Sequence, residues 1–147
     1  MEKQLKSCFM IMPFRAEFDE IYQEIILPTF DENPQWNLEC KRGDDMFTTG
    51  SIMQDVWVAI RDASVVIAEL TGRNPNVFYE LGIAHVLKKP TIMISQSIDD
   101  VPFDIRHLRC ITYKLGPRAL RDLSSKLVST IDNVIATDVM EVEVFRD

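Results

Sequence analysis

The sequence predicts an α/β fold in which a parallel sheet is covered by helices on both faces. Five short apolar runs alternate along the chain with segments of helical periodicity. None of the five shows the strict in/out alternation of a strand with one face in water, so we expect both faces of the sheet to be covered. Strands that alternate with helices in this way form parallel βαβ units with right-handed crossovers.

The five apolar runs are the expected strands. Three are strongly apolar, at residues 8–12, 64–68 and 91–95, and two are weaker, at residues 36–40 and 109–113. We expect them to pair in the order 2-1-3-4-5, which is a flavodoxin-like three-layer fold. In such a sheet the ligand crevice opens beyond the carboxyl ends of the strands, where the strand order reverses between the first and third strands.

Four helices are expected from apolar residues that recur at spacings of three and four. The first is expected to end near Pro28, and the third to start at residues 74–76 and run to about Lys89. The apolar stripes of the first, second and fourth helices are Phe18, Ile21, Tyr22 and Ile25; Ile52, Val56, Ala59, Ile60 and Ala63; and Leu120, Leu123, Leu127 and Val134. The tail at residues 141–145 alternates polar and apolar residues, which predicts an edge strand or an exchanged arm.

Length and charge limit the classes of function. The 147 residues, 46% of them hydrophobic, fit one domain over residues 1–147 with a single core. A net charge of -7 argues against nucleic acid or an anionic membrane as the main partner. No apolar run reaches the roughly 18 residues of a membrane span, and the start lacks a signal peptide's apolar core, so we expect a cytoplasmic protein.

The crevice rule selects three loops, at residues 13–15, 42–45 and 70–76. In the third, an N-cap at Asn76 would place Glu80 one turn into its helix, where the helix dipole would hold its carboxylate ionised. A carboxylate there can stabilise the oxocarbenium-like transition state of glycosidic cleavage or trap the sugar covalently. Equally, Glu80 can be an ordinary acidic residue of an early helical turn, whose interaction with the helix dipole stabilises the helix by under about 1 kcal/mol. In the second loop, Asp45 either binds a ribose hydroxyl or base edge or is a common turn residue.

Two stretches resemble the nucleoside 2-deoxyribosyltransferase-like superfamily. They are Val66-Ile67-Ala68-Glu69-Leu70 and Asn74-Pro75-Asn76-Val77-Phe78-Tyr79-Glu80-Leu81-Gly82-Ile83-Ala84, followed by Lys89-Pro90. The resemblance covers about residues 8–113, and its specific part is residues 65–90. It implies a flavodoxin-like fold and the cleavage or exchange of a base on nucleosides or nucleoside 5′-monophosphates.

The resemblance also implies roles for individual residues. The catalytic Glu of the superfamily matches Glu80, and an upstream Asp that contacts the sugar or base matches Asp55, with Asp62 as the rival. Arg15 matches residues that hold the sugar 5′ end or its phosphate, and the planar guanidinium suits a phosphate.

Four more residues are candidate substrate contacts. Asn74, with the free amides at the start of its helix, is a second anion contact or only shapes the turn before Pro75. Asn76, two residues after Asn74, is a further candidate substrate contact. Phe14 and Tyr79 either stack on the base or belong to the core.

The pattern favours hydrolysis over transfer. Typical deoxyribosyltransferases carry an Asp-Ser-Gly loop shortly before the catalytic Glu, and this chain has Asn74-Pro75-Asn76 there. We expect no cofactor and no metal, because the three cysteines are scattered and no zinc-binding or Gly-rich phosphate motif occurs. The alternatives are a Toll-interleukin-receptor-like NAD glycohydrolase and a non-catalytic nucleotide sensor of a bacterial signalling or defence system. The superfamily resemblance further implies a homodimer or a higher homo-oligomer.

Overall fold

The computed structural model describes residues 5–43 and 52–144, with side chains described for residues 5–43 and 53–137. Five parallel strands form one sheet in the order β2-β1-β3-β4-β5, which confirms the predicted topology. The strands are β1 (Lys6–Ile11), β2 (Leu38–Arg42), β3 (Val65–Glu69), β4 (Thr91–Ser95) and β5 (Cys110–Thr112).

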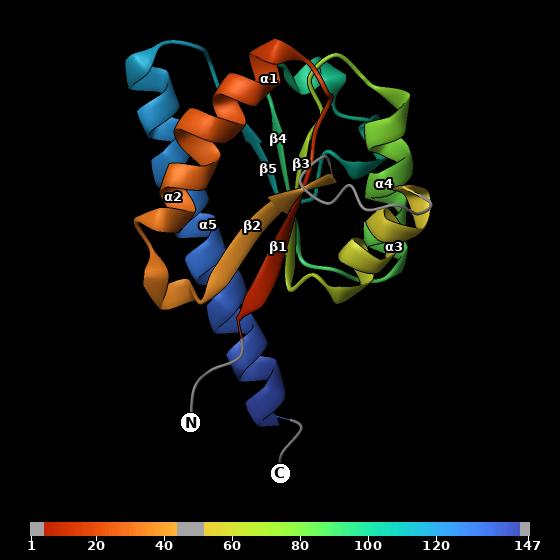
Figure 1. Ribbon diagram of the computed structural model, residues 1–147, viewed down its shortest axis with the longest axis vertical. Helices are drawn as coiled ribbons and strands as arrows, with labels where there is room; N and C mark the ends of the chain where they lie inside the picture. Colours follow the sequence, from red (N-terminus) through yellow and green to blue (C-terminus); the bar gives the residue numbers. More distant parts are fainter. Residues whose placement is uncertain (1–4, 44–51, 145–147) are drawn as a thin grey trace.

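Helices cover both faces of the sheet, as the apolar strands require (Figure 1). One face carries α1 (Ala16–Ile21), η1 (Tyr22–Ile26), α2 (Leu27–Asp31) and α5 (Pro117–Val144), and the other carries α3 (Ile52–Asp62) and α4 (Pro75–Val86). Alternate residues of β1 enter the two cores: Cys8 and Met10 face α1, α2 and α5, whereas Phe9 and Ile11 face α3 and α4. Short 3₁₀ segments, η2 (Pro34–Trp36), η4 (Ile98–Asp100) and η5 (Phe103–Ile105), complete the connections.

The first helical segment does not end at Pro28, which corrects the sequence prediction. It continues to Asp31 through the π-helical turns of η1. Proline lacks an N–H group, and in a regular α-helix its ring would collide with the carbonyl group four residues earlier. The wider π turn directly before Pro28 removes the need for that hydrogen bond and makes room for the ring.

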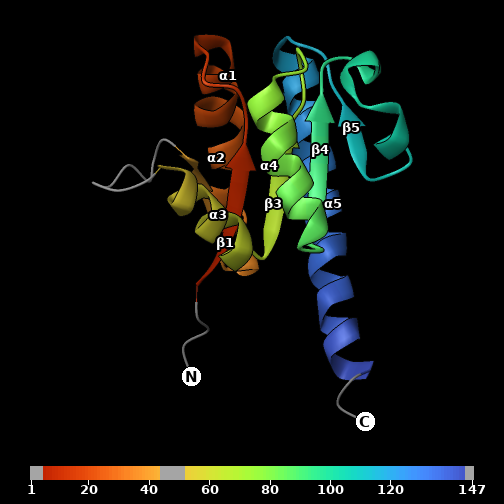
Figure 2. The same cartoon turned by 90° about the vertical axis from the view of Figure 1, so that its right-hand side faces the viewer.

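Residues 141–144 are helical, so the predicted edge strand is wrong. Helix α5 runs without interruption to Val144 and extends past the sheet (Figure 2). Leu123, Leu127 and Ile131 are fully buried against the sheet. Once that packing has nucleated the helix, each added residue gains a hydrogen bond, so a few alternating residues do not stop it. No helix in the described ranges is long and apolar enough to cross a membrane.

Candidate functional site

The strand order reverses between β1 and β3. After β1 the chain passes through residues 12–15 into α1 on one face, and after β3 it passes through residues 70–74 into α4 on the other face. The two connections therefore diverge at the carboxyl edge, which is where open α/β sheets bind ligands. Helix α4 packs on β1 and β3, directly over this switch point.

Asn74, and not Asn76, caps helix α4. Its Oδ1 accepts the N–H groups of Asn76 at 2.9 Å and Val77 at 3.3 Å. Pro75 is the first residue of the helix and has no N–H group. The amides that we expected to be free for an anion are thus occupied by the cap, and the observed role of Asn74 is to shape the turn.

Glu80 is the sixth residue of α4 and lies beside its buried stripe, Val77, Leu81 and Ala84. Its side chain is half-buried, and this burial raises the pKa of the carboxyl group to about 7. The expectation of a carboxylate held ionised by the helix dipole is therefore wrong, because that field fades beyond the first turn and desolvation dominates. Glu80 makes no hydrogen bond or ion pair within the described part of the chain.

The loop after β1 carries Phe14 and Arg15. The ring of Phe14 is 66% exposed and lies near the end of β2 and α3, since a Cβ atom on Gly43 would stand 3.6 Å from Phe14 Cζ and 3.8 Å from Val56 Cγ2. Arg15 occupies the N-cap position of α1, its side chain is exposed, and its guanidinium has no partner among the described residues. Both side chains therefore face solvent at the carboxyl edge.

The structure separates the two candidate aspartates. Asp55 is half-buried on the first turn of α3, beside the buried Val56. Asp62 is the last residue of α3, is exposed, and pairs with Arg61 at 2.9 Å. The backbone that follows Asp62 bonds to the start of β1, through Ser64 N–H and the Ser7 carbonyl, so Asp62 lies at the amino edge. Asp55 stays the candidate of the two.

The other predicted contacts have different positions. Asn76 is exposed at the start of α4, and Tyr79, 55% exposed, lies on the outer side of that helix, about 100° around its axis from Glu80. The structure does not direct Tyr79 toward Glu80. Asp45 lies outside the described residues.

Two charged residues at the carboxyl edge were missed as site residues. Arg42, the last residue of β2, is 5% exposed; its Nη1 is 2.6 Å from Asp19 Oδ1, and its guanidinium carbon is 4.5 Å from the centroid of the Tyr22 ring. Glu69, the last residue of β3, is fully buried. For Glu69 the available signal was a charge at the end of the apolar run Val65–Glu69, whereas β2 already carries Glu39 and Lys41, so the sequence carries no comparable signal for Arg42.

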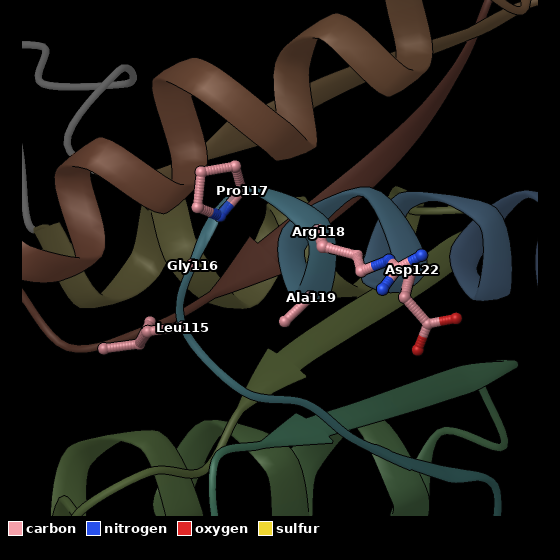
Figure 3. A pocket seen from close by; sticks show the side chains of 6 residues that line it. All are labelled: Leu115, Gly116, Pro117, Arg118, Ala119 and Asp122. Atoms are coloured by element: carbon pink, nitrogen blue, oxygen red, sulfur yellow. The ribbon is translucent and has the colours of Figure 1, made fainter.

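Surface hollows also lie away from Glu80. One, of about 540 Å³, surrounds the turn that leads into α5 and is lined by Leu115, Gly116, Pro117, Arg118, Ala119 and Asp122 (Figure 3). A neighbouring hollow of about 370 Å³ includes Gln96 and Tyr113. Neither contains a residue that we predicted for the site. No group of three or more His, Cys, Asp or Glu residues in the described ranges is arranged to hold a metal ion.

Comparison with known proteins identifies the fold. No protein-family model and no curated protein matches the chain. Among solved structures, the CMP N-glycosidase BcmB from Clostridium botulinum matches with a TM-score of 0.63 at 14% identity, covering 83% of this chain and 97% of that one. A 2-deoxyribosyltransferase from Bacillus psychrosaccharolyticus matches with a TM-score of 0.59 at 11% identity, covering 80% and 90%.

A 2-deoxyribosyltransferase from Leishmania mexicana matches less of both chains. The TM-score is 0.51 at 21% identity, and the match covers 63% of this chain and 65% of that one, which is under two thirds of its length. The three similarities together show that this chain has the nucleoside 2-deoxyribosyltransferase-like fold.

Proposed function

We propose that the protein cleaves the N-glycosidic bond of a nucleoside or nucleoside 5′-monophosphate, with Glu80 acting at C1′ of the sugar. The observation that carries the proposal is a half-buried carboxyl group without a protein partner, on the helix that covers the switch point. Two other carboxylates at the carboxyl edge are engaged: Asp19 with Arg42, and Asp100 with Gly72 and Arg73. The fold is shared with proteins named as 2-deoxyribosyltransferases and a CMP N-glycosidase.

The chemistry follows from the position of one carboxylate. As the bond from C1′ to the base nitrogen breaks, its electron pair leaves with the base and positive charge builds on the sugar. Ionised Glu80 stabilises that charge or forms a glycosyl ester. A water molecule then adds its hydroxyl group to C1′, which releases the Glu80 carboxylate, and its remaining proton goes to the departed base. In the free protein, burial imposes a desolvation penalty on the ionised form of Glu80. The positive charge that develops on the sugar offsets this penalty in the transition state.

The remaining residues have proposed supporting roles. Asp55 orients the sugar, the exposed guanidinium of Arg15 binds the 5′ end, and Phe14 contacts the base. Because the amides of α4 are occupied by Asn74, Arg15 is the stronger candidate for a phosphate contact. We propose hydrolysis over transfer on the Asn74-Pro75-Asn76 sequence.

The test is release of free base. The protein is incubated with nucleosides, nucleoside monophosphates and NAD, and free base is measured by chromatography. We expect release by the parent protein and a loss of about 10²–10⁴-fold in Glu80→Gln, whereas Glu32→Gln, an exposed control on the far end of α2, keeps full activity. Release from NAD alone would favour the NAD glycohydrolase, and binding without release in either protein would favour the sensor.

We also propose a homodimer, formed through the outer faces of α3 and α4. This α3–α4 face consists of Trp57, Val58, Tyr79, Gly82 and Val86, and one turn beyond Trp57 and Val58 the exposed Arg61 and Asp62 form an ion pair with each other. Two chains of net charge -7 repel each other, so an apolar face whose neighbouring charges are paired is a surface on which they can meet. On α4, Tyr79 and Val86 are equally spaced about Gly82 and Ile83, so a two-fold axis there would set Tyr79 of one copy against Val86 of the other.

A further inference from the structure

A closed ring of four hydrogen bonds lies at the carboxyl ends of β3, β4 and β5. The buried carboxyl group of Glu69 accepts the Thr71 N–H through Oε1, at 2.6 Å, and the Tyr113 hydroxyl through Oε2. The Thr71 hydroxyl oxygen accepts the Gln96 N–H at 2.9 Å, and Gln96 Nε2 donates to the Tyr113 oxygen at 3.3 Å. The ring therefore joins three neighbouring strands to one loop residue, Thr71.

Thr71 begins the turn from which α4 starts. Gly72 and Arg73 follow with φ angles of 83° and 57°, a left-handed conformation that only a well-held turn retains at Arg73. The Gly72 N–H donates to Asp100 Oδ2 at 2.9 Å, and Arg73 Nη2 donates to the Asp99 carbonyl at 2.6 Å. The ring holds the turn from the sheet side and η4 holds it from outside, so the origin of α4 is fixed from both directions.

Joining strands through a buried carboxylate carries a desolvation penalty. Burial raises the pKa of Glu69, which shows that its ionised form is disfavoured, and apolar side chains of similar size would hold the strands at lower cost. What apolar side chains cannot do is fix the direction of the Thr71 N–H and of the turn that follows. The ring is therefore best explained by the geometry that it imposes on α4.

We propose that Glu69 is a positioning residue, which through the hydrogen-bonded ring fixes the start of α4 and so holds Glu80 half-buried at the carboxyl edge. The role in catalysis rests on the proposed function, but the placement of Glu80 does not. Glu69 itself is fully buried and both of its carboxyl oxygens are bonded, so it acts through Glu80 and does not touch substrate.

The test variant is Tyr113→Phe, which opens the ring by removing a single hydroxyl group. Its matched control is Thr29→Val, which removes another buried hydroxyl, bonded to Ser124 and to the Ile25 carbonyl between α2 and α5, on the face of the sheet that does not carry α4. Thr71→Val, which removes the acceptor for Gln96 N–H, serves if Tyr113→Phe does not fold. Both hydroxyl deletions destabilise the protein, but only the ring variants release the start of α4.

The first readout is the titration of the Glu80 carboxyl carbon by NMR, which needs no substrate. We expect the pKa, about 7 in the parent, to fall by about one unit in the ring variants as water reaches the side chain, and to stay in place in Thr29→Val. The second readout is kinetic: kcat falls about tenfold in the ring variants while KM stays within about twofold, because Glu80 acts on the transition state.

The outcomes separate the two proposals. If no nucleoside is cleaved but the Glu80 titration moves as expected, the proposed function is wrong and the positioning role of Glu69 stands. If the parent cleaves its substrate and the ring variants keep the parent titration and kcat, losing only as much stability as Thr29→Val, the positioning role is wrong.

Discussion

Glu80 is chemically useful because its surroundings do not favour its charge. Its carboxyl group is half-buried beside Val77, Leu81 and Ala84, and burial raises its pKa to about 7. At neutral pH the free protein therefore holds similar amounts of the protonated and ionised forms. Only the ionised form can stabilise a sugar cation, so kcat/KM should rise with pH and level off above about 7.

The same burial predicts that Glu80→Gln is more stable than the parent in alkaline solution. The folded protein holds the Glu80 proton more tightly than the unfolded chain, so this contribution to stability is complete below pH 4.5 and is lost as pH rises through 7. Glutamine resembles the neutral form at every pH. We expect the difference in the free energy of unfolding to grow from near zero at pH 4.5 to about 1–2 kcal/mol in favour of the variant at pH 8, after allowing for partial exposure.

Urea denaturation at pH 4.5, 6 and 8 measures this difference directly. The Glu32→Gln control, on an exposed carboxyl group, should show no comparable trend with pH. A difference that is constant across the range, or one that favours the parent at pH 8, would mean that Glu80 is not desolvated in the folded protein.

Helix α4 depends on its cap, and the two asparagines beside Pro75 allow a matched comparison. Asn74 Oδ1 binds two N–H groups of the helix, whereas the exposed Asn76 side chain forms no cap. We expect Asn74→Ala to lower the free energy of unfolding by about 1 kcal/mol, Asn74→Asp to retain most of it, and Asn76→Ala to change it little. Thermal unfolding of the three variants checks this, and equal losses for both Ala variants would place the cap elsewhere.

Sequence periodicity was sufficient for the order of elements and insufficient for their ends. The strong apolar runs predicted β1, β3 and β4, which are buried on both faces, whereas the weaker runs correspond to the edge strands β2 and β5, where Glu39, Lys41 and Thr112 are exposed. The order 2-1-3-4-5 followed from the alternation of strands and helices. The ends depend on local competition that periodicity does not record: a π turn carries the first helix past Pro28, and helix propagation overrides the alternation at residues 141–144. Asn74 and Asn76 are the same residue type, so the choice of the cap depends on backbone angles that the sequence does not record.

The sequence was sufficient to select single residues of the candidate site, but not the contacts between residues that are distant in the sequence. Glu80 could be selected from its place on a helix at the switch point. Its raised pKa could not be predicted, because it depends on how deeply the side chain is buried when α4 packs against the sheet. The Glu69 ring joins residues up to 44 positions apart in the sequence, and the ion pair of Arg42 with Asp19 crosses 23. Such contacts arise only when the strands are side by side.

At the scale of the whole molecule, the two helical layers differ in how they meet solvent. The α3–α4 face exposes Trp57, Tyr79 and Val86, the last at 82%, whereas Glu80 lies at the boundary between this layer and the sheet. A second copy covering that face would restrict the motion of α4 from outside, as the Glu69 ring does from the sheet. Dimerisation and the placement of Glu80 are therefore expected to be coupled through α4.

The proposed dimer predicts that Val86→Lys is a folded monomer. Val86 is so exposed that lysine causes no loss of core packing, but in a two-fold interface it would bury a charge beside Tyr79 of the partner. Light scattering should give twice the 17.0 kDa chain mass for the parent and the single mass for Val86→Lys. Gln23→Lys, which adds the same charge on the exposed side of the opposite layer, should remain a dimer. A parent that stays monomeric at high concentration, or a Val86→Lys variant that still pairs, would show that the copies do not meet through α4.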